Sequence, residues 1–272
     1  MSRNYLFLFY CLIAVGVVVP ASAQNYPTKS VRILVGFAPG GSTDILARLI
    51  AQEMTKNVGQ QVVVDNRPGA GGNIAAELVS KAPPDGYTLH ACTTGVFAIQ
   101  PFLYSKLPYD PEKGIAPVTQ TGSLPYIIVV HPSLPVKGTR DFINFVKARP
   151  GQVNYASSGV GTASHLSAAL FASAAGLNMV HVPYKGGSTA VTGMLGNEVN
   201  MMVANMVVIK PLVASARLRA YAVAANKRSD HLPGVPSIAE AGLPGLEVPQ
   251  FYALFAPART PGPVITRLEN EL

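Results

Sequence analysis

The feature that most constrains the fold of this chain is a repeated order of segments, in which a short β-type run leads through a glycine-rich loop into a helix-type run. The clearest cases are the loop Pro39-Gly40-Gly41-Ser42-Thr43-Asp44 and the loop 157–165. Alternation of strand and helix continues along most of the chain. It predicts an α/β fold with largely parallel sheets flanked by helices.

The expected elements follow from the spacing of the apolar residues. Helix-type runs have apolar residues every three or four positions and end at a glycine, as at Gly59 and Gly176. A capping-box pattern at Ser237 and Glu240 predicts a late helix, and another is expected near Pro263. We expect strands over 31–37, 61–65, 87–93, 126–131, 153–157, 179–184, 199–204, 218–225 and 247–255, and helices over 44–58, 73–81, 141–148, 164–175 and 189–195.

Two turn-rich segments, 122–125 and 225–236, bracket the middle of the chain. They predict a discontinuous organisation in which residues 24–124 and 227–272 form the first domain and residues 125–226 form the second. The chain then crosses twice between the domains, and two crossings of this kind form a hinge.

The N-terminus has the pattern of a secretory signal peptide. Arg3 precedes an apolar run over 5–19, and Ala21-Ser22-Ala23 follows it, which predicts cleavage after Ala23 and export to the periplasm. The run is shorter than the ~20 residues of a spanning helix, so we expect no membrane span after cleavage. Cys92 then remains as the single thiol, so the fold must depend on its core rather than on disulfides.

The charge pattern indicates the kind of partner. The formal net charge is +7, which fits acidic partners, but the basic residues are scattered and no aromatic and basic stripe occurs. Nucleic acid is therefore not expected as a partner. A small anionic ligand needs only a local positive potential.

Both glycine-rich loops suit an anion. Glycine lets backbone N–H groups approach a ligand, hydroxyls add donors, and the N-terminus of a helix carries about half a positive charge. The loops match neither the P-loop nor the dinucleotide-binding pattern. Two such loops, about 115 residues apart, predict a clamp between two domains, and glycines that only make tight turns are the alternative.

Catalytic and metal signals are weak. The histidines are scattered and form no metal-binding spacing, so we expect no metal and no cofactor. Ser164 and His165 are neighbours on a predicted helix and point in different directions, and the GxSxG motif is absent. An exported serine esterase or amidase that uses Ser164 or a nearby serine is therefore the alternative function, and binding without catalysis is the leading one.

Several motifs together resemble those of the substrate-binding proteins of tripartite tricarboxylate transporters, the Bug-type family. The resemblance covers residues 26–272. It is densest at Phe37-Ala38-Pro39-Gly40-Gly41-Ser42-Thr43-Asp44, 66–73, 81–89, 107–110, 155–166, 181–186 and 240–245.

This resemblance implies a two-domain periplasmic binding protein, with a mixed sheet in each domain and a ligand cleft between them. Such a receptor closes around a small mono- or dicarboxylate and presents it to the subunits of a membrane transporter; we expect a monomer. A carboxylate sensor for a membrane kinase would use the same site. The resemblance also implies some tens of residues beyond Leu272, so the second part of the first domain is expected to be truncated.

The resemblance assigns ligand-binding residues to each side of the cleft. Asp44 is included, although we expect it to cap backbone N–H groups rather than to touch the anion. Tyr184, Lys185 and Asn205 are further candidates. The first side comprises Gly40, Gly41, Ser42, Thr43 and Asp44, and the second Ser158, Gly159, Gly161, Thr162 and Ser164.

Overall fold

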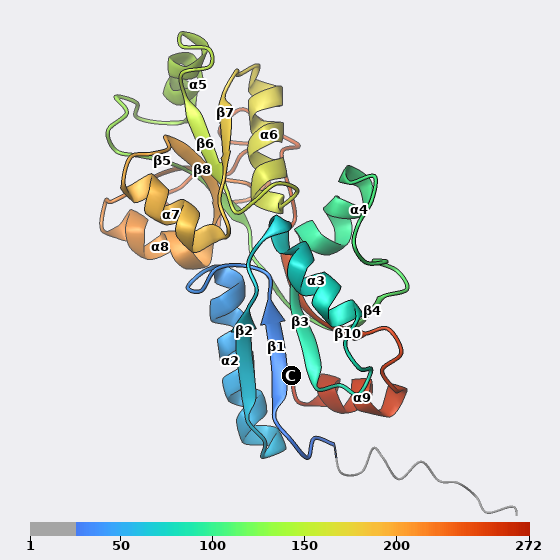
Figure 1. The fold of residues 1–272 in the computed structure, drawn as a ribbon. Helices are drawn as coiled ribbons and strands as arrows, with labels where there is room; N and C mark the ends of the chain where they lie inside the picture. Colours follow the sequence, from blue (N-terminus) through green and yellow to red (C-terminus); the bar gives the residue numbers. More distant parts are fainter. Residues whose placement is uncertain (1–25) are drawn as a thin grey trace, which may run out of the picture.

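The computed structural model describes residues 26–272 and has two lobes, each with one five-stranded sheet (Figure 1). The predicted signal peptide and its cleavage after Ala23 lie outside the described residues. Within residues 26–272, helices are too short or too polar to cross a membrane. Both sheets are mixed and both are flanked by helices, which confirms the predicted fold class.

The first lobe has the strand order β2-β1-β3-β10-β4. The strands β1, β2 and β3 are parallel, and β10 runs antiparallel between β3 and β4. The register of the three parallel strands is seen at Ile33 of β1, which pairs with Val64 of β2 on one side and Leu89 of β3 on the other. The elements are β1 Val31–Val35, α2 Ser42–Val58, β2 Val62–Asn66, α3 Asn73–Ser80, β3 Thr88–Thr93, α4 Gln100–Leu103, β4 Ile115–Ser123, β10 Phe251–Pro257 and α9 Gly262–Asn270.

The second lobe repeats the scheme with the order β7-β6-β8-β5-β9. Here β6 is parallel to β7 and β8, and β5 is antiparallel to β8 and β9. The elements are β5 Tyr126–Val130, α5 Thr139–Lys147, β6 Asn154–Ser157, α6 Ala163–Ala175, β7 Val180–Pro183, α7 Gly187–Leu195, β8 Met201–Asn205, α8 Met206–Ala214 and β9 Arg219–Val223.

Each sheet is covered on both faces. Successive residues of a strand point to opposite faces, so Ile33 packs with Met54 of α2 while Leu34 packs with Val79 of α3. In the second lobe, Phe142 and Phe171 from α5 and α6 form one core layer, and residues of α7 and α8 form the other. Strands buried on both faces explain the nearly continuous apolar runs in the sequence.

Helices α2 and α6 end at the predicted glycines. Gly59 and Gly176 take the left-handed conformation, with φ of 67° and 62°. The late helix expected at Ser237 is wrong, because the chain makes only one turn there. Ser237 and Glu240 do form the reciprocal capping bonds, but Gly242 follows with φ of 88°, and Leu243 N–H donates to Ile238 O at 3.0 Å. This C-terminal motif closes the turn before a helix can grow.

Strand β4 and helix α8 were not predicted. Strand β4 contains Pro117 and Gly122, and two register shifts interrupt its pairing with β10. Buried and exposed residues therefore do not alternate regularly along it. Helix α8 contains Pro211, which removes a backbone donor. Pairing with β10 stabilises β4, and burial of Ile209 in the core stabilises α8, although the local sequence signals for both elements are weak.

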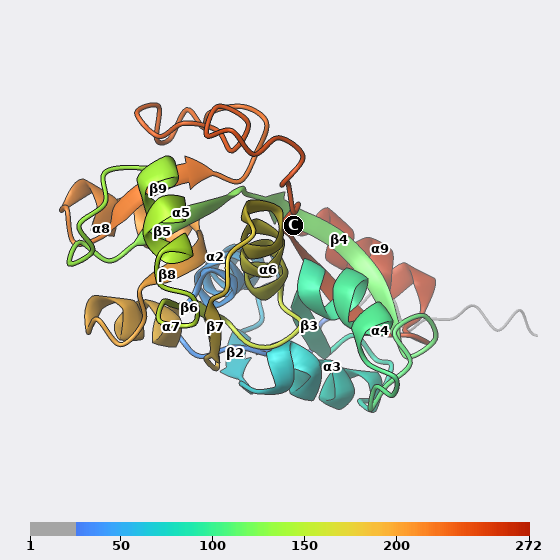
Figure 2. The same ribbon diagram turned by 90° about the horizontal axis from the view of Figure 1, so that it is seen from above.

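The chain crosses between the lobes at residues 123–126 and 248–251. The two crossings lie side by side, since Leu124 N–H and the Ser123 hydroxyl both donate to Gln250 O, at 3.2 and 2.9 Å. The segment before the second crossing packs on the second lobe: Ile238 and Val248 share a core with Tyr126. Figure 2 shows this segment beside β9 and α5. These contacts differ from the predicted boundary at residue 226, which assigned the whole of 227–272 to the first lobe.

In the first lobe, the backbone after β1 and the backbone before α3 approach each other closely. A Cβ atom on Gly36 would lie 2.6 Å from Gly72 Cα. We therefore expect Gly36→Ala to lower the free energy of unfolding by about 1–3 kcal/mol, measured by chemical denaturation. Gly234→Ala is the matched control, because Gly234 has open space around its Cα and no positive φ. Equal effects of the two substitutions would contradict this account.

Candidate functional site

A cleft between the lobes is built from the ends of strands. Thr93 ends β3 and Asn205 ends β8, while Ser158 follows β6, and all three residues line the cleft. In mixed and parallel sheets, ligands bind outside the carboxyl ends of the strands. The two lobes face each other with these edges, so one ligand can contact both.

Four helices of the described chain begin at this cleft. Helix α2 begins after Gly41, α6 after Thr162, α7 at Gly187 and α8 after Asn205, and all four residues line the cleft. Each N-terminus contributes about half a positive charge from its peptide dipoles. Within residues 26–272, no lining residue carries a charged side chain. The positive potential at the cleft therefore comes from the backbone.

The second loop is held by its own hydroxyls. The Ser164 hydroxyl accepts from Ser158 N–H at 2.9 Å and lies 3.2 Å from the Thr162 hydroxyl. Thr162 donates to Gly159 O at 2.7 Å and caps α6 by accepting from His165 N–H. This network fixes the loop in one shape and leaves little reorganisation for ligand binding.

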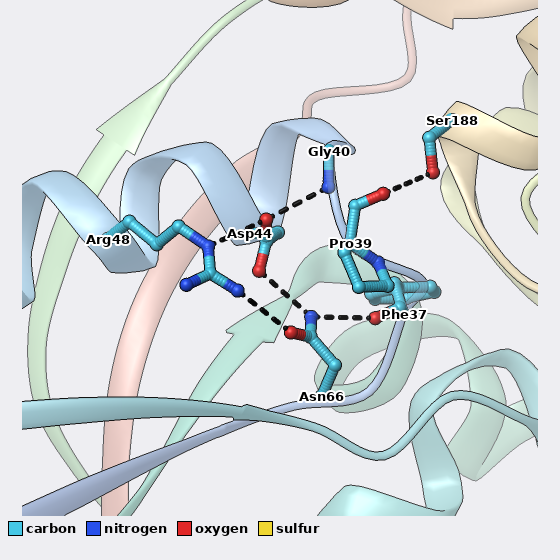
Figure 3. Close-up of polar contacts among 7 residues, drawn as sticks. All are labelled: Phe37, Pro39, Gly40, Asp44, Arg48, Asn66 and Ser188. Atoms are coloured by element: carbon cyan, nitrogen blue, oxygen red, sulfur yellow. Dashed lines mark hydrogen bonds and ion pairs between the residues drawn. The ribbon is translucent and has the colours of Figure 1, made fainter.

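Asp44 holds the first loop (Figure 3). Its carboxylate accepts from Gly40 N–H at 2.9 Å, Arg48 Nε at 3.0 Å and Asn66 Nδ2 at 2.9 Å. Burial raises the pKa of Asp44, but these hydrogen bonds outweigh burial, so the pKa of the carboxyl lies below its ordinary value. Asp44 is 3% exposed and faces its own loop rather than the cleft.

The two lobes touch at the rim of the cleft. Ala38 N–H donates to Lys185 O at 3.0 Å. The Ser188 hydroxyl donates to Pro39 O at 2.8 Å, as Figure 3 shows. A Cβ atom on Gly186 would lie 2.9 Å from Ala38 N, so only glycine permits this approach. The structure is therefore a closed arrangement of the lobes.

The cleft includes only part of the predicted residue set. Gly40 and Asp44 support the first loop from behind, and Gly161 packs against Gln100 and Tyr104. Gly159, Tyr184 and Lys185 line a neighbouring pocket instead. The Tyr184 hydroxyl donates to Glu198, which lines neither the cleft nor this pocket, and Lys185 is exposed. The predicted residues that line the cleft are Gly41, Ser42, Thr43, Ser158, Thr162, Ser164 and Asn205.

Other lining residues were missed. Thr93 and Tyr126 stand at the ends of strands, and this position is the signal that could have found them. Gln250 lies in an irregular crossing and has no local signal. An apolar set from α7, β8 and α8 completes the wall: Val191, Met202, Ala204 and Val208.

Two stacked histidines lie behind the second loop. The rings of His165 and His181 are 4.1 Å apart between centroids. His165 Nδ1 accepts from Gly161 N–H at 3.3 Å, and His181 Nε2 lies 2.7 Å from the Ser157 hydroxyl. Burial lowers the pKa of His165; burial, with the neighbouring His165, lowers the pKa of His181 to about 4. Both rings are therefore neutral at pH 7.

The structure offers no assembled catalytic or metal site in residues 26–272. Ser164 bonds to Ser158 and Thr162 rather than to a histidine. The Ser157 hydroxyl, which meets His181, is fully buried, and the Ser133 hydroxyl, which meets His131, lies at an exposed position outside the cleft lining. Groups of three or more His, Cys, Asp or Glu side chains with metal-binding geometry do not occur in this part of the chain.

The Asp44 network predicts a large effect of its removal. Asp44→Ala leaves Gly40 N–H, Arg48 and Asn66 without their shared acceptor, and we expect the free energy of unfolding to fall by about 3 kcal/mol. Glu53→Ala in the same helix is the control. It removes an exposed ion pair with Lys56 and should change stability by less than about 0.5 kcal/mol in chemical denaturation. Similar losses in both variants would refute the role of Asp44.

The histidine pair predicts acid sensitivity. The pKa of His181 in the folded protein, about 4, lies below its ordinary value of 6.5. The stability that comes from keeping this ring neutral is therefore fully present above pH 6.5 and is lost as the pH falls towards 4. His181→Gln should reduce this loss by about 1 kcal/mol, because solvent screens a half-buried ring. Thermal unfolding from pH 7.5 to 4 measures the effect. The exposed His231→Gln should leave the profile unchanged, and an unchanged profile in His181→Gln would contradict the assignment.

Comparison with known proteins identifies the family. The model of the tripartite tricarboxylate transporter family receptor matches residues 46–272. Protein BugT of Bordetella pertussis (strain Tohama I) is 34% identical over 273 residues, covering 100% of this chain and 84% of BugT.

Solved structures agree with this match. R. palustris Rpa4515 with adipate has 38% identity and a TM-score of 0.88, covering 90% of this chain and 82% of that one. MatC (Rpa3494) from Rhodopseudomonas palustris with bound malate has 34% identity and a TM-score of 0.87, covering 90% and 84%. The matched family is described as a transporter receptor, which argues against the esterase alternative. Because the family match spans most of the chain, the chain belongs to the tripartite tricarboxylate transporter receptors, a family of periplasmic binding proteins and not of enzymes.

Proposed function

We propose that this receptor binds a small organic anion through its carboxylate in the cleft between the lobes, and delivers it to a tripartite tricarboxylate-type transporter in the membrane. The observation that carries the proposal is the convergence of four helix N-termini on a cleft without a charged side chain, within the described residues. The bound adipate of Rpa4515 and malate of MatC support a carboxylate as the ligand class.

An ionised carboxylate loses its hydration when the lobes close. Several charge-assisted hydrogen bonds are needed to offset this loss, and donors already aimed at the site need little reorganisation. The backbone of the first loop and the hydroxyls of Ser42, Ser158 and Ser164 supply such donors from both lobes. A cation would meet the positive ends of the helices, so the site selects anions.

Ligand binding would be coupled to closure. The bonds from Ala38 to Lys185 and from Ser188 to Pro39 join the lobes and can form only when the rims meet. The paired crossings at residues 123–126 and 248–251 provide the hinge. The closed pair of lobes would then present one continuous surface to the membrane subunits.

Calorimetric titration tests the ligand class. We expect at least one carboxylate from a panel that includes adipate and malate to bind, and its neutral amide analogue to bind at least tenfold more weakly. Ser164→Ala should weaken the carboxylate by about tenfold, the effect of one hydrogen bond. Ser173→Ala, on the exposed face of the same helix, is the control. A panel without any binding carboxylate, or equal binding of the neutral analogue, would refute the proposal.

We also propose that export removes residues 1–23. Expression of the full chain in a Gram-negative host should give a periplasmic protein whose N-terminal sequence begins at Gln24. A cytoplasmic protein that retains Met1 would contradict this. Co-purification of cross-linked membrane subunits from the same cells distinguishes delivery to a transporter from signalling to a kinase.

A further inference from the structure

Two residues that line the cleft each have a buried polar side-chain atom without a hydrogen-bond partner among the described residues. The two atoms are the Nδ2 donor of Asn205 and the Oε1 acceptor of Gln250. The residues are 6% and 3% exposed. A buried donor or acceptor that stays unpaired costs about 1–3 kcal/mol, so a ligand that pairs both atoms gains affinity.

The orientation of Asn205 is fixed by its role in the fold. Its Oδ1 accepts from Val207 N–H at 3.0 Å and caps α8. The Nδ2 group must therefore point away from the helix. The cap also pairs Val207 N–H, so this one backbone donor of α8 is not available to a ligand.

Gln250 lies beside a hydrogen bond that leads to the first loop. The Tyr252 hydroxyl, two residues further along the chain, donates to the Ser42 hydroxyl at 2.9 Å. The amide oxygen of Gln250 is buried and has no hydrogen-bond partner among the described residues, so it is the atom of this side chain that is left for a ligand.

The surroundings of this pair are uncharged. Helix α7 begins beside the first loop: Gly187 N and Ser188 N would lie 3.8 and 3.7 Å from a Cβ on Gly41. The dipole of α7 would therefore stabilise the same ligand carboxylate as the dipole of α2. The Lys185 side chain is exposed and belongs to the neighbouring pocket, and Arg48 is paired with Asp44. A second carboxylate near Gln250 would meet an acceptor oxygen and no cation.

From this arrangement we infer that the ligand carries one carboxylate and a second, neutral group at Asn205 and Gln250. The neutral group both accepts and donates a hydrogen bond. A hydroxyl or a carboxamide meets this requirement, with the acceptor on Asn205 Nδ2 and the donor on Gln250 Oε1. The inference rests on the proposed carboxylate function. It makes Asn205 and Gln250 the residues that distinguish this ligand from a dicarboxylate.

Titration calorimetry with matched ligands of equal chain length tests the inference. The two series are adipate, its monoamide, 6-hydroxyhexanoate and hexanoate, and succinate, its monoamide, 4-hydroxybutanoate and butanoate. In the series that binds, the monoamide or the hydroxy acid should bind at least tenfold more tightly than the dicarboxylate. It should also bind more tightly than the unsubstituted acid, which leaves both polar atoms unpaired.

Two variants assign the effect to the residues. Gln250→Met keeps the length of the side chain and removes the acceptor, and Asn205→Asp keeps the cap on α8 and removes the donor. Gln250→Met should lower the affinity for the monoamide or hydroxy acid about tenfold more than the affinity for the unsubstituted acid. Asn205→Asp also adds a negative charge to the cleft, so it should weaken every anion of the series and weaken the monoamide or hydroxy acid most. Gln152→Met, at an exposed position, is the control.

The outcomes separate the two proposals. A dicarboxylate that binds as tightly as its monoamide, or Gln250→Met with unchanged preference, overturns the inference and leaves the carboxylate function intact. If neither series nor the wider panel contains a binding carboxylate, the proposed function itself fails.

Discussion

The position of helix N-termini at the facing edges of two sheets is the constraint on which the rest of this receptor depends. A strand that passes through a short loop into a helix places the helix N-terminus beside the carboxyl end of the strand, and β1–α2 and β6–α6 both do so. Because the lobes face each other with these edges, their dipoles point into one cleft. The site can therefore attract an anion without a charged side chain in the lining.

This geometry requires backbone segments to approach one another closely, and the glycines follow from it. Where the two lobes meet at the neighbouring pocket, a Cβ on Gly159 would lie 3.3 Å from Gly71 Cα, and Gly159 has φ of 135°. Gly186 combines a positive φ of 150° with its approach to Ala38. Side chains at these positions would keep the lobes apart, so the glycines of the loops serve closure as well as ligand approach.

Features fixed by local chemistry could be predicted from the sequence, and features fixed by tertiary contacts could not. The ends of α2 and α6 follow from Gly59 and Gly176, and the two loops follow from their glycines and hydroxyls. Gln250 reaches the cleft only because the second crossing lies beside the first. Lys185 and Tyr184 have suitable chemistry, but the turn after β7 directs them to the neighbouring pocket.

The crossing at Gln250 connects the hinge to the ligand site through named atoms. The backbone oxygen of Gln250 accepts from Leu124 and Ser123 of the other crossing, while Tyr252, two residues further along, donates through its hydroxyl to Ser42 at the start of α2. A ligand that pairs with the Gln250 oxygen therefore acts on the residue that joins the two crossings. Under the proposed function, neither lobe alone supplies all the donors for a carboxylate, so the ligand would stabilise only the closed arrangement, and separation of the loops would be sufficient to release it.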